Sequence, residues 1–178
     1  MPRMKVIGPD EAQGEVKAVF EDVARKMGTV PAIFQGMANS PAALKAYLAM
    51  SEALAGGQLA PEDREVIYLA VSENNGCHYC ASAHTMLAQR VGLSAEEALA
   101  ARQFASPDSS RDALLKFVRR VIETRGFVDD DDLAAVRDAG YSDGQIAESI
   151  AYIGLATYSN LFNHVHDTPL DFPPAPRL

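Results

Sequence analysis

The sequence predicts an all-α protein, because apolar residues recur at helical spacing along most of the chain and no period-two pattern persists. The one run that could form a strand, residues 66–71, has charged flanks that favour a buried helix segment. Glycine, proline and capping residues divide the chain into segments of helical length. The 178 residues suffice for one domain with a sizeable core, and they contain no internal repeat or linker.

Three helices are expected in the first third of the chain. Apolar residues between positions 9 and 27 have helical spacing, and a short helix follows at residues 31–37. Ser40 is a favourable N-cap for a third helix, with Pro41 in the first helical position. The glycine pair at 56–57 ends that helix.

Residues 61–91 are predicted to form two helices that fold back on each other. The first opens with Pro61 and acidic residues, a favoured start because the helix dipole attracts negative charge. The turn at residues 74–76, Asn-Asn-Gly, then reverses the chain, and Gly92 closes the second helix.

The starts of the later helices are marked by capping or charge signals: Ser94 with Glu97, Pro107, the four aspartates at 129–132, and Ser142 with Gln145. The last helix is the longest, and we expect its buried stripe to consist of Ile146, Ile150, Ile153, Thr157 and Leu161. The tail from residue 167 carries four prolines and cannot be helical.

The composition indicates a globular protein and argues against some classes of partner. A hydrophobic fraction of 48% and a charged fraction of 22% are ordinary for a globular chain. The formal net charge of −8 gives no electrostatic footprint for nucleic acid or for an anionic membrane. The sequence shows no apolar segment of signal-peptide or membrane-span length. We therefore expect a cytoplasmic protein that binds neither nucleic acid nor membrane.

Both cysteines of the chain lie in one short motif. Cys77 and Cys80 are three residues apart, and His84 lies four residues beyond the second. If Gly76 opens a helix, the three side chains share one face of it. Cys77 would occupy the first turn, where the helix dipole favours the reactive thiolate. The pattern indicates a nucleophile and its resolving partner, with an imidazole that can take the proton.

Glu65 belongs to the same constellation. It lies on the helix that precedes the Asn-Asn-Gly turn, twelve residues before Cys77. The chain reversal brings this helix alongside its successor, so the carboxylate comes within reach of the cysteines. It could then hold or relay a proton for His84. The alternative is an ordinary solvated charge on a helix surface.

The cysteine pair itself admits three interpretations. Cys77 and Cys80 could be two small buried residues, or they could bind a structural zinc together with His84 and one further ligand. A second pair of ligands like the first is absent from the sequence. The third interpretation is redox chemistry, which a lone CxxC in a chain of this kind favours. His84 could equally be a core histidine whose hydrogen bonds are satisfied.

The motif made of Glu65, Cys77-His78-Tyr79-Cys80 and His84 resembles the core motif of the carboxymuconolactone decarboxylase-like superfamily. More narrowly, it is similar to that of the AhpD-like, peroxidase-related branch. The resemblance implies a single AhpD-like helical bundle. Its core spans about residues 40–166, with an N-terminal helical extension at 1–39 and a Pro-rich tail at 167–178.

The resemblance also implies an activity, the reduction of hydroperoxides through a Cys77–Cys80 disulfide, without a metal or another cofactor. By this analogy Cys80 attacks the peroxide, Cys77 resolves, and His84 and Glu65 relay protons. An external dithiol is the implied reductant, and the implied assembly is a homo-oligomer, a trimer or a hexamer. The alternatives are a non-catalytic redox sensor, a zinc-stabilised scaffold, and a decarboxylase of cyclic lactone acids, which has no need of a dithiol.

One position departs from the family pattern. Characterised hydroperoxidases of the family carry a histidine directly before the second cysteine, where this chain has Tyr79. The nearest histidine is His78, rotated by about 100° on a helix. His78 is either a bystander or a proton acceptor, and Tyr79 either packs or lines a substrate pocket. The resemblance further suggests that Asn160 and His164 of the last helix lie near the site or at a subunit contact.

Overall fold

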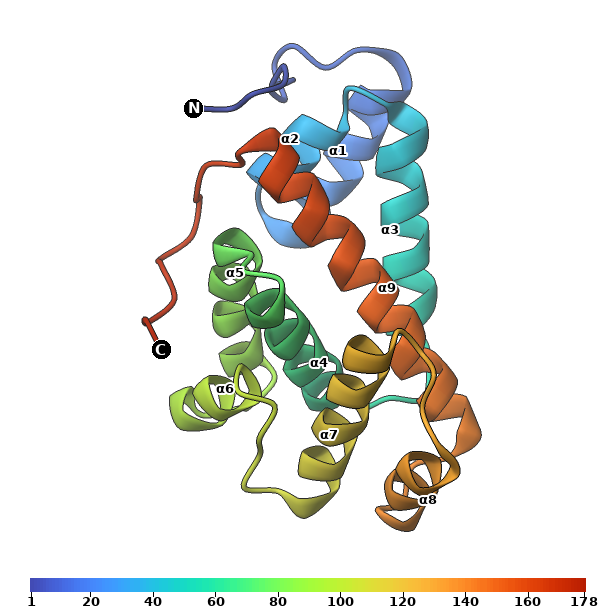
Figure 1. Ribbon diagram of the computed structural model, residues 1–178. Helices are drawn as coiled ribbons and strands as arrows, with labels where there is room; N and C mark the ends of the chain where they lie inside the picture. Colours follow the sequence, from blue (N-terminus) through green and yellow to red (C-terminus); the bar gives the residue numbers. More distant parts are fainter.

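Nine α-helices build the structure, a computed structural model that describes residues 1–178 (Figure 1). They are α1 (Gly14–Met27), α2 (Ala32–Met37), α3 (Pro41–Ala55), α4 (Pro61–Asn74), α5 (His78–Arg90), α6 (Ala95–Ala101), α7 (Ser109–Thr124), α8 (Asp130–Asp138) and α9 (Asp143–His166). The chain contains no strand, so the all-α prediction is confirmed. None of the helices is both long and apolar enough to cross a membrane.

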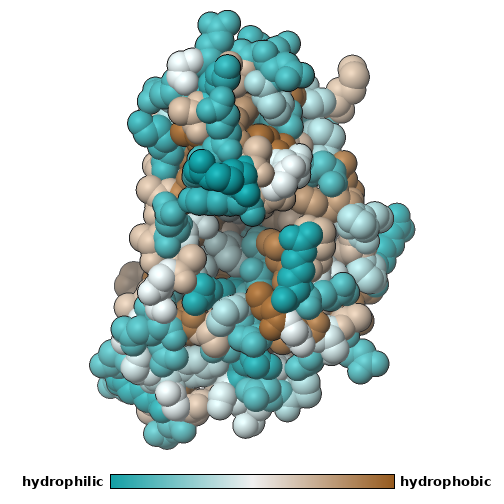
Figure 2. Space-filling view, turned by 180° about the vertical axis from the view of Figure 1, so that it is seen from behind, coloured by the Kyte–Doolittle hydropathy of each residue, from teal (hydrophilic) through white to brown (hydrophobic).

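The central helix is α4, which packs against α5, α6, α7 and α9. Every residue from Val66 to Ser72 is buried, on all sides of the helix. A helix that is apolar all round is typical of a buried core element, so the expected buried segment at 66–71 is confirmed. The outer face opposite to that of Figure 1 is largely hydrophilic, with small apolar patches near its middle (Figure 2).

The N-terminal helices form one apolar cluster with the cysteines. Helices α1 and α2 pack beside α3 and the end of α9 (Figure 1). The cluster joins buried residues of α1, α2, α3 and the start of α5: Val16, Phe20, Val23, Ile33, Phe34, Met37, Leu44, Cys77, Tyr79 and Cys80. The first forty residues therefore cover the dithiol as well as adding helices to one end of the bundle.

Most helix ends agree with the predicted signals. Ser40 caps α3 by accepting the amide of Ala43, and complete capping boxes open α6 and α9. Two predicted starts are wrong. The first helix begins at Gly14 because residues 9–11 form a turn, and Pro107 lies outside α7 because the Asp108 carboxylate caps that helix.

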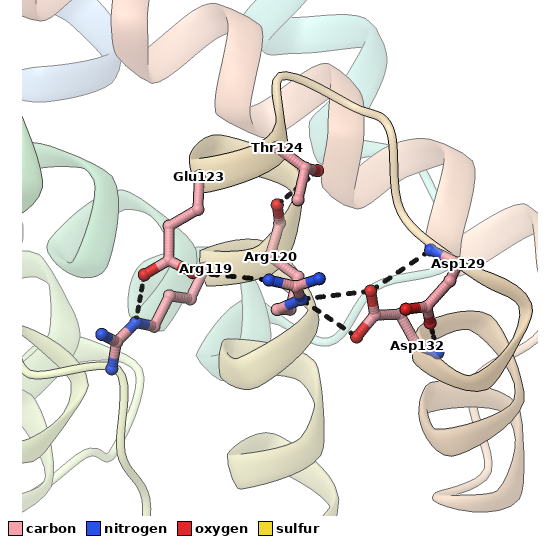
Figure 3. A network of polar contacts seen from close by, with 6 residues as sticks. All are labelled: Arg119, Arg120, Glu123, Thr124, Asp129 and Asp132. Carbon is pink, nitrogen blue, oxygen red and sulfur yellow. Dashed lines mark hydrogen bonds and ion pairs between the residues drawn. The ribbon is translucent and has the colours of Figure 1, made fainter.

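The aspartates at the start of α8 do more than cap it. Asp129 and Asp132 form a capping box, and the Asp132 carboxylate also accepts hydrogen bonds from Nε of Arg120 on α7, at 3.2 Å (Figure 3). Arg119 and Glu123 pair beside them on α7 (Figure 3). The run marks a helix start, as expected, and one of its members also ties α8 to α7.

The buried face of α9 differs from the predicted apolar stripe. Ile150 and Leu161 are 49% and 57% exposed. The buried face instead carries polar side chains: Ser149, Ser159, Asn160, Asn163 and His166. The prediction failed because apolar periodicity identifies a buried face only where the neighbouring surface is apolar, and part of α9 packs against polar groups of α4 and α5.

A carboxylate joins the start of α9 to the connection between α3 and α4. Glu148 accepts the amides of Gln58 and Leu59 at 2.8–2.9 Å. A Cβ at Gly57 would lie 2.6 Å from this carboxylate. A side chain at this position would therefore displace the carboxylate from these amides, so the glycine permits the close approach.

His166 fixes the other end of α9 against α2. Its ring is fully buried, its Nδ1 lies 2.8 Å from the Thr168 hydroxyl, and its Nε2 has no hydrogen-bond partner. A Cβ at Gly36 would lie 2.7 Å from the ring. Burial lowers the pKa of His166, because the imidazolium would lose its hydration, and the carboxylate of Asp167 only partly opposes this effect.

Protonation of His166 should destabilise the fold. The pKa of this ring is lower in the folded chain than in the unfolded chain, so the unfolded state binds more protons. Its contribution to stability is complete above the unfolded pKa of about 6.5 and is lost as the pH falls through the folded value. In urea titrations from about pH 7.5 to about pH 5, His166→Asn should show a smaller loss of unfolding free energy than wild type. Equal pH slopes for the two proteins would contradict the assignment.

Candidate dithiol site

The turn between α4 and α5 places the cysteines. Gly76 adopts φ 69°, a left-handed conformation that suits glycine, and Cys77 follows as the N-cap of α5. The prediction that Cys77 lies inside the first turn is therefore wrong by one position. Its Sγ accepts the amide of Cys80 at 3.4 Å, in the manner of a capping oxygen. Both cysteines are free and buried, and their Sγ atoms are 2.7 Å apart.

The two thiols are not equivalent. The Cys77 thiol donates to the Cys80 sulfur, which lowers the pKa of Cys80 to about 6 despite its burial, and His84, Asn160 and Asn163 add to the effect. The same hydrogen bond, together with burial, raises the pKa of Cys77. Cys80 is therefore the thiolate of the pair at neutral pH.

Side chains of α9 provide the polar surroundings of Cys80. Nδ2 of Asn163 donates to the Cys80 sulfur at 3.1 Å and lies 3.9 Å from that of Cys77. The Ser159 hydroxyl is 4.0 Å from the Cys80 sulfur. The Oδ1 of Asn163 is buried without a hydrogen-bond partner, which costs free energy. The hydrogen bonds of this amide are therefore those that its Nδ2 donates to sulfur.

The chain reversal brings Glu65 and His84 together, as expected. Oε2 of Glu65 lies 2.8 Å from Nδ1 of His84, and each side chain is less than 15% exposed. The imidazole stacks on Tyr68 at a centroid distance of 4.0 Å. Burial would lower the pKa of His84, but the charges of Glu65 and Cys80 outweigh it and raise that pKa. An imidazole whose affinity for a proton is raised thus lies one helical turn from the Cys80 sulfur.

His78 and Tyr79, the two residues between the cysteines, lie in different surroundings. His78 is exposed and lines a cavity beside Cys77. Tyr79 is buried, its ring packs edge-on against Phe172 at 5.3 Å, and its hydroxyl accepts the amide of Ile33 at 3.4 Å. The structure therefore gives Tyr79 a packing position and leaves His78 as the solvent-facing group next to the first cysteine.

The expectations for the last helix are partly met. Asn160 is buried behind the dithiol, where it accepts from Asn75 at 2.9 Å and donates to the Ser72 hydroxyl at 3.3 Å. His164 is exposed and does not take part in the site. Sequence reasoning missed Ser159 and Asn163. The available signal was their one-turn spacing on a helix face that carries several small polar side chains.

No three His, Cys, Asp or Glu side chains are placed to hold a metal ion together. Cys77, Cys80 and His84 therefore lack the convergent geometry of a structural zinc site, which needs four ligands. The donor set around the sulfurs consists of amides and a hydroxyl, which suit a thiolate.

Comparison with known families agrees with the geometry. Residues 41–123 match the carboxymuconolactone decarboxylase family, a segment that runs from the start of α3 into α7 and contains the whole dithiol motif. The predicted resemblance to the AhpD-like carboxymuconolactone decarboxylase superfamily is confirmed over this segment. No curated protein matches its sequence at a significant level.

Solved structures share the fold over most of this chain. An uncharacterized peroxidase-related protein with an AhpD core from Ralstonia eutropha JMP134 superposes with a TM-score of 0.84 at 24% identity, covering 96% of this chain and 92% of that one. For the debrominase Bmp8 bound to 2,3,4-tribromopyrrole, the TM-score is 0.77 at 19% identity, over 96% and 94%. For a protein of unknown function from Agrobacterium tumefaciens, proposed to act in antioxidant defence, it is 0.68 at 25%, over 76% and 94%.

Asn163→Ala should raise the apparent pKa of the Cys80 thiol by about one unit, because the thiolate loses a hydrogen-bond donor. The ultraviolet absorbance of the thiolate, or the rate of alkylation as a function of pH, measures the change. Gln89→Ala, an exposed amide on the same helix as the cysteines, is the matched control and should leave the titration unchanged. An unaltered titration in Asn163→Ala would contradict the role of this amide.

Glu65→Gln should lower the pKa of His84 below its ordinary value of about 6.5, because burial then acts without the opposing carboxylate. The loss of the imidazolium should in turn raise the pKa of Cys80. NMR titration of the histidine ring signals follows the first effect, and thiol alkylation follows the second. Glu96→Gln, on an exposed position of α6, serves as the control. A His84 titration unaffected by Glu65→Gln would contradict the pairing.

Proposed function

We propose that the protein is a thiol-dependent hydroperoxide reductase that alternates between a Cys77/Cys80 dithiol and an intramolecular disulfide. The observation that carries the proposal is the asymmetry of the pair. A thiol of lowered pKa lies 2.7 Å from a protonated partner, within one helical turn. The first is suited to nucleophilic attack, and the second is in place to resolve the product.

In the proposed reaction the Cys80 thiolate attacks the terminal oxygen of a hydroperoxide. The O–O bond breaks and the alkoxide leaves, taking a proton that His84, paired with Glu65, is suited to supply. The Cys80 sulfenic acid then condenses with the Cys77 thiol, releasing water and forming the disulfide. An external dithiol reduces this disulfide by thiol exchange, becomes oxidised itself and completes the cycle.

The similar structures support an antioxidant-related function without fixing the reaction. The Ralstonia and Agrobacterium proteins are described as peroxidase-related or as acting in antioxidant defence. Bmp8 has the same fold and is a debrominase, so the fold alone serves more than one reaction. A redox sensor would form the same disulfide without turnover, and a lactone decarboxylase would not need the thiols.

Cys80→Ser should abolish the consumption of cumene hydroperoxide in the presence of dithiothreitol. Cys77→Ser should still form a sulfenic acid, which dimedone traps on Cys80, and then stall. Wild type should lose two hydrogens per chain on mild oxidation, measured by intact mass. Trapping on Cys77 would reverse the two roles, and loss of bromide from 2,3,4-tribromopyrrole without peroxide consumption would favour dehalogenation. Oxidation without turnover would favour the redox sensor.

We also propose a homo-oligomer built on threes. Helix α9 leaves an apolar stripe in solvent, in which Ile150, Tyr158, Leu161 and Val165 are 40–60% exposed. Exposed apolar side chains at helical spacing are suited to contact with another chain. The Pro-rich tail, which could have crossed to a neighbouring subunit, lies on its own chain instead.

Light scattering at micromolar concentration should give a mass three or six times the 19.1 kDa of one chain. The double substitution Leu161→Asp and Val165→Asp should reduce this mass, because two charges in an apolar contact are costly to bury. Glu21→Gln, on the exposed side of α1, is the control. A wild-type mass near that of one chain would contradict the assembly.

A further inference from the structure

A cavity of about 310 Å³ opens beside one cysteine and not the other. Its walls come from the α4–α5 turn, from the first turn of α5, from Arg102 after α6 and from tail residues 176–178. Cys77 is part of this lining, whereas Cys80 is not. The volume is at the lower end of the range for pockets that accept small molecules.

The tail is fixed across α5 by four contacts with different parts of the chain. The Asp171 carboxylate accepts the amide of Ala32 at 2.7 Å, and Phe172 packs on Tyr79. Two hydrogen bonds complete the attachment: the Ala175 amide donates to Ser82 Oγ at 2.9 Å, and Arg102 Nη1 donates to the carbonyl of Pro176 at 2.7 Å.

Arg102 holds the end of the tail firmly. Its side chain is only 5% exposed and is also paired with Glu73 at 2.8 Å, so the guanidinium is itself fixed when it binds the Pro176 carbonyl. Pro176 is therefore a positioned part of the cavity wall, and Arg177 and Leu178 extend that wall from it.

We propose that the reducing thiol enters through this cavity and attacks the Sγ of Cys77, and that residues 176–178 limit the size of the thiol that can reach it. This inference rests on the proposed function, since it requires the Cys77–Cys80 disulfide. It assigns a thiol of small-molecule dimensions as the partner, because the opening is a confined pocket.

The reductant supplies both electrons that reduce the Cys77–Cys80 disulfide. The thiolate of the reductant bonds to the Cys77 sulfur, the Cys77–Cys80 bond breaks, and Cys80 leaves as a thiolate. A second thiol of the reductant then attacks the mixed disulfide, releasing Cys77, and the reductant departs as a disulfide.

The direction of attack follows from access and from the leaving group. Exchange is faster when the departing thiol has the lower pKa, and Asn163 and His84 stabilise the negative charge on Cys80. Attack on Cys80 would require approach to a sulfur outside the cavity and would expel the thiol of higher pKa. Both considerations select Cys77.

Mass spectrometry can identify the attacked sulfur in the wild-type protein. The disulfide is formed with diamide, exposed briefly to excess β-mercaptoethanol, quenched in acid and labelled with N-ethylmaleimide. Cleavage after Tyr79 separates the two cysteines. The thiol adduct should lie on Cys77 and the maleimide on Cys80. The reverse pattern would overturn this inference alone, whereas failure of diamide to form the disulfide would overturn the proposed function together with it.

Truncation tests the part played by the tail. The quantity to compare is the rate of disulfide reduction by 1-thioglucose divided by the rate with the smaller thiol β-mercaptoethanol. Removing residues 176–178 should raise this ratio by roughly threefold or more, because the larger thiol gains access to Cys77. Ser82→Ala, which loosens Ala175, should change the ratio in the same direction. Leu170→Ala, at an exposed tail position away from the cavity, is the control. An unchanged ratio in the truncated protein would overturn the size limit.

Discussion

The amide of Asn163 reaches from α9 to the sulfur of Cys80, and the arrangement of the whole site depends on this contact between the last helix and the α4–α5 hairpin. Buried polar groups require partners, so the small polar side chains of α9 can turn inward only where the hairpin presents complementary atoms. Asn160 meets Ser72 and Asn75 in the same way. These bonds fix the rotation of α9 about its axis, and consequently its apolar side chains face outward.

The sequence was sufficient to predict what is decided locally. Helix boundaries depend on caps and glycines, and Glu65 meets His84 because one tight turn and one helical spacing determine the distance. The rotation of α9 could not be predicted in this way. Ile150 and Leu161 satisfy the usual apolar pattern, yet they are exposed, because hydrogen bonding to residues far away in the chain outweighs that pattern.

Tyr79 illustrates a second limit of local reasoning. Its position in the motif invites comparison with a catalytic histidine, but its contacts are with Phe172 from the tail and Ile33 from α2. Both partners lie more than forty residues away, and neither has a sequence signal that points to α5. The tail was correctly expected to be non-helical, but its course follows from scattered single hydrogen bonds, which no periodicity reveals.

Glu65, His84 and Cys80 are buried close together. The proton affinity of His84 and the oxidation state of the cysteine pair therefore depend on each other. Part of the affinity of His84 for its proton comes from the negative sulfur beside it. Any event that removes this negative charge, whether alkylation or disulfide formation, lowers that affinity, and His84 releases its proton more readily. The midpoint potential of the dithiol should accordingly vary with pH over the range in which this buried histidine titrates, so the site links the gain of electrons to the gain of protons.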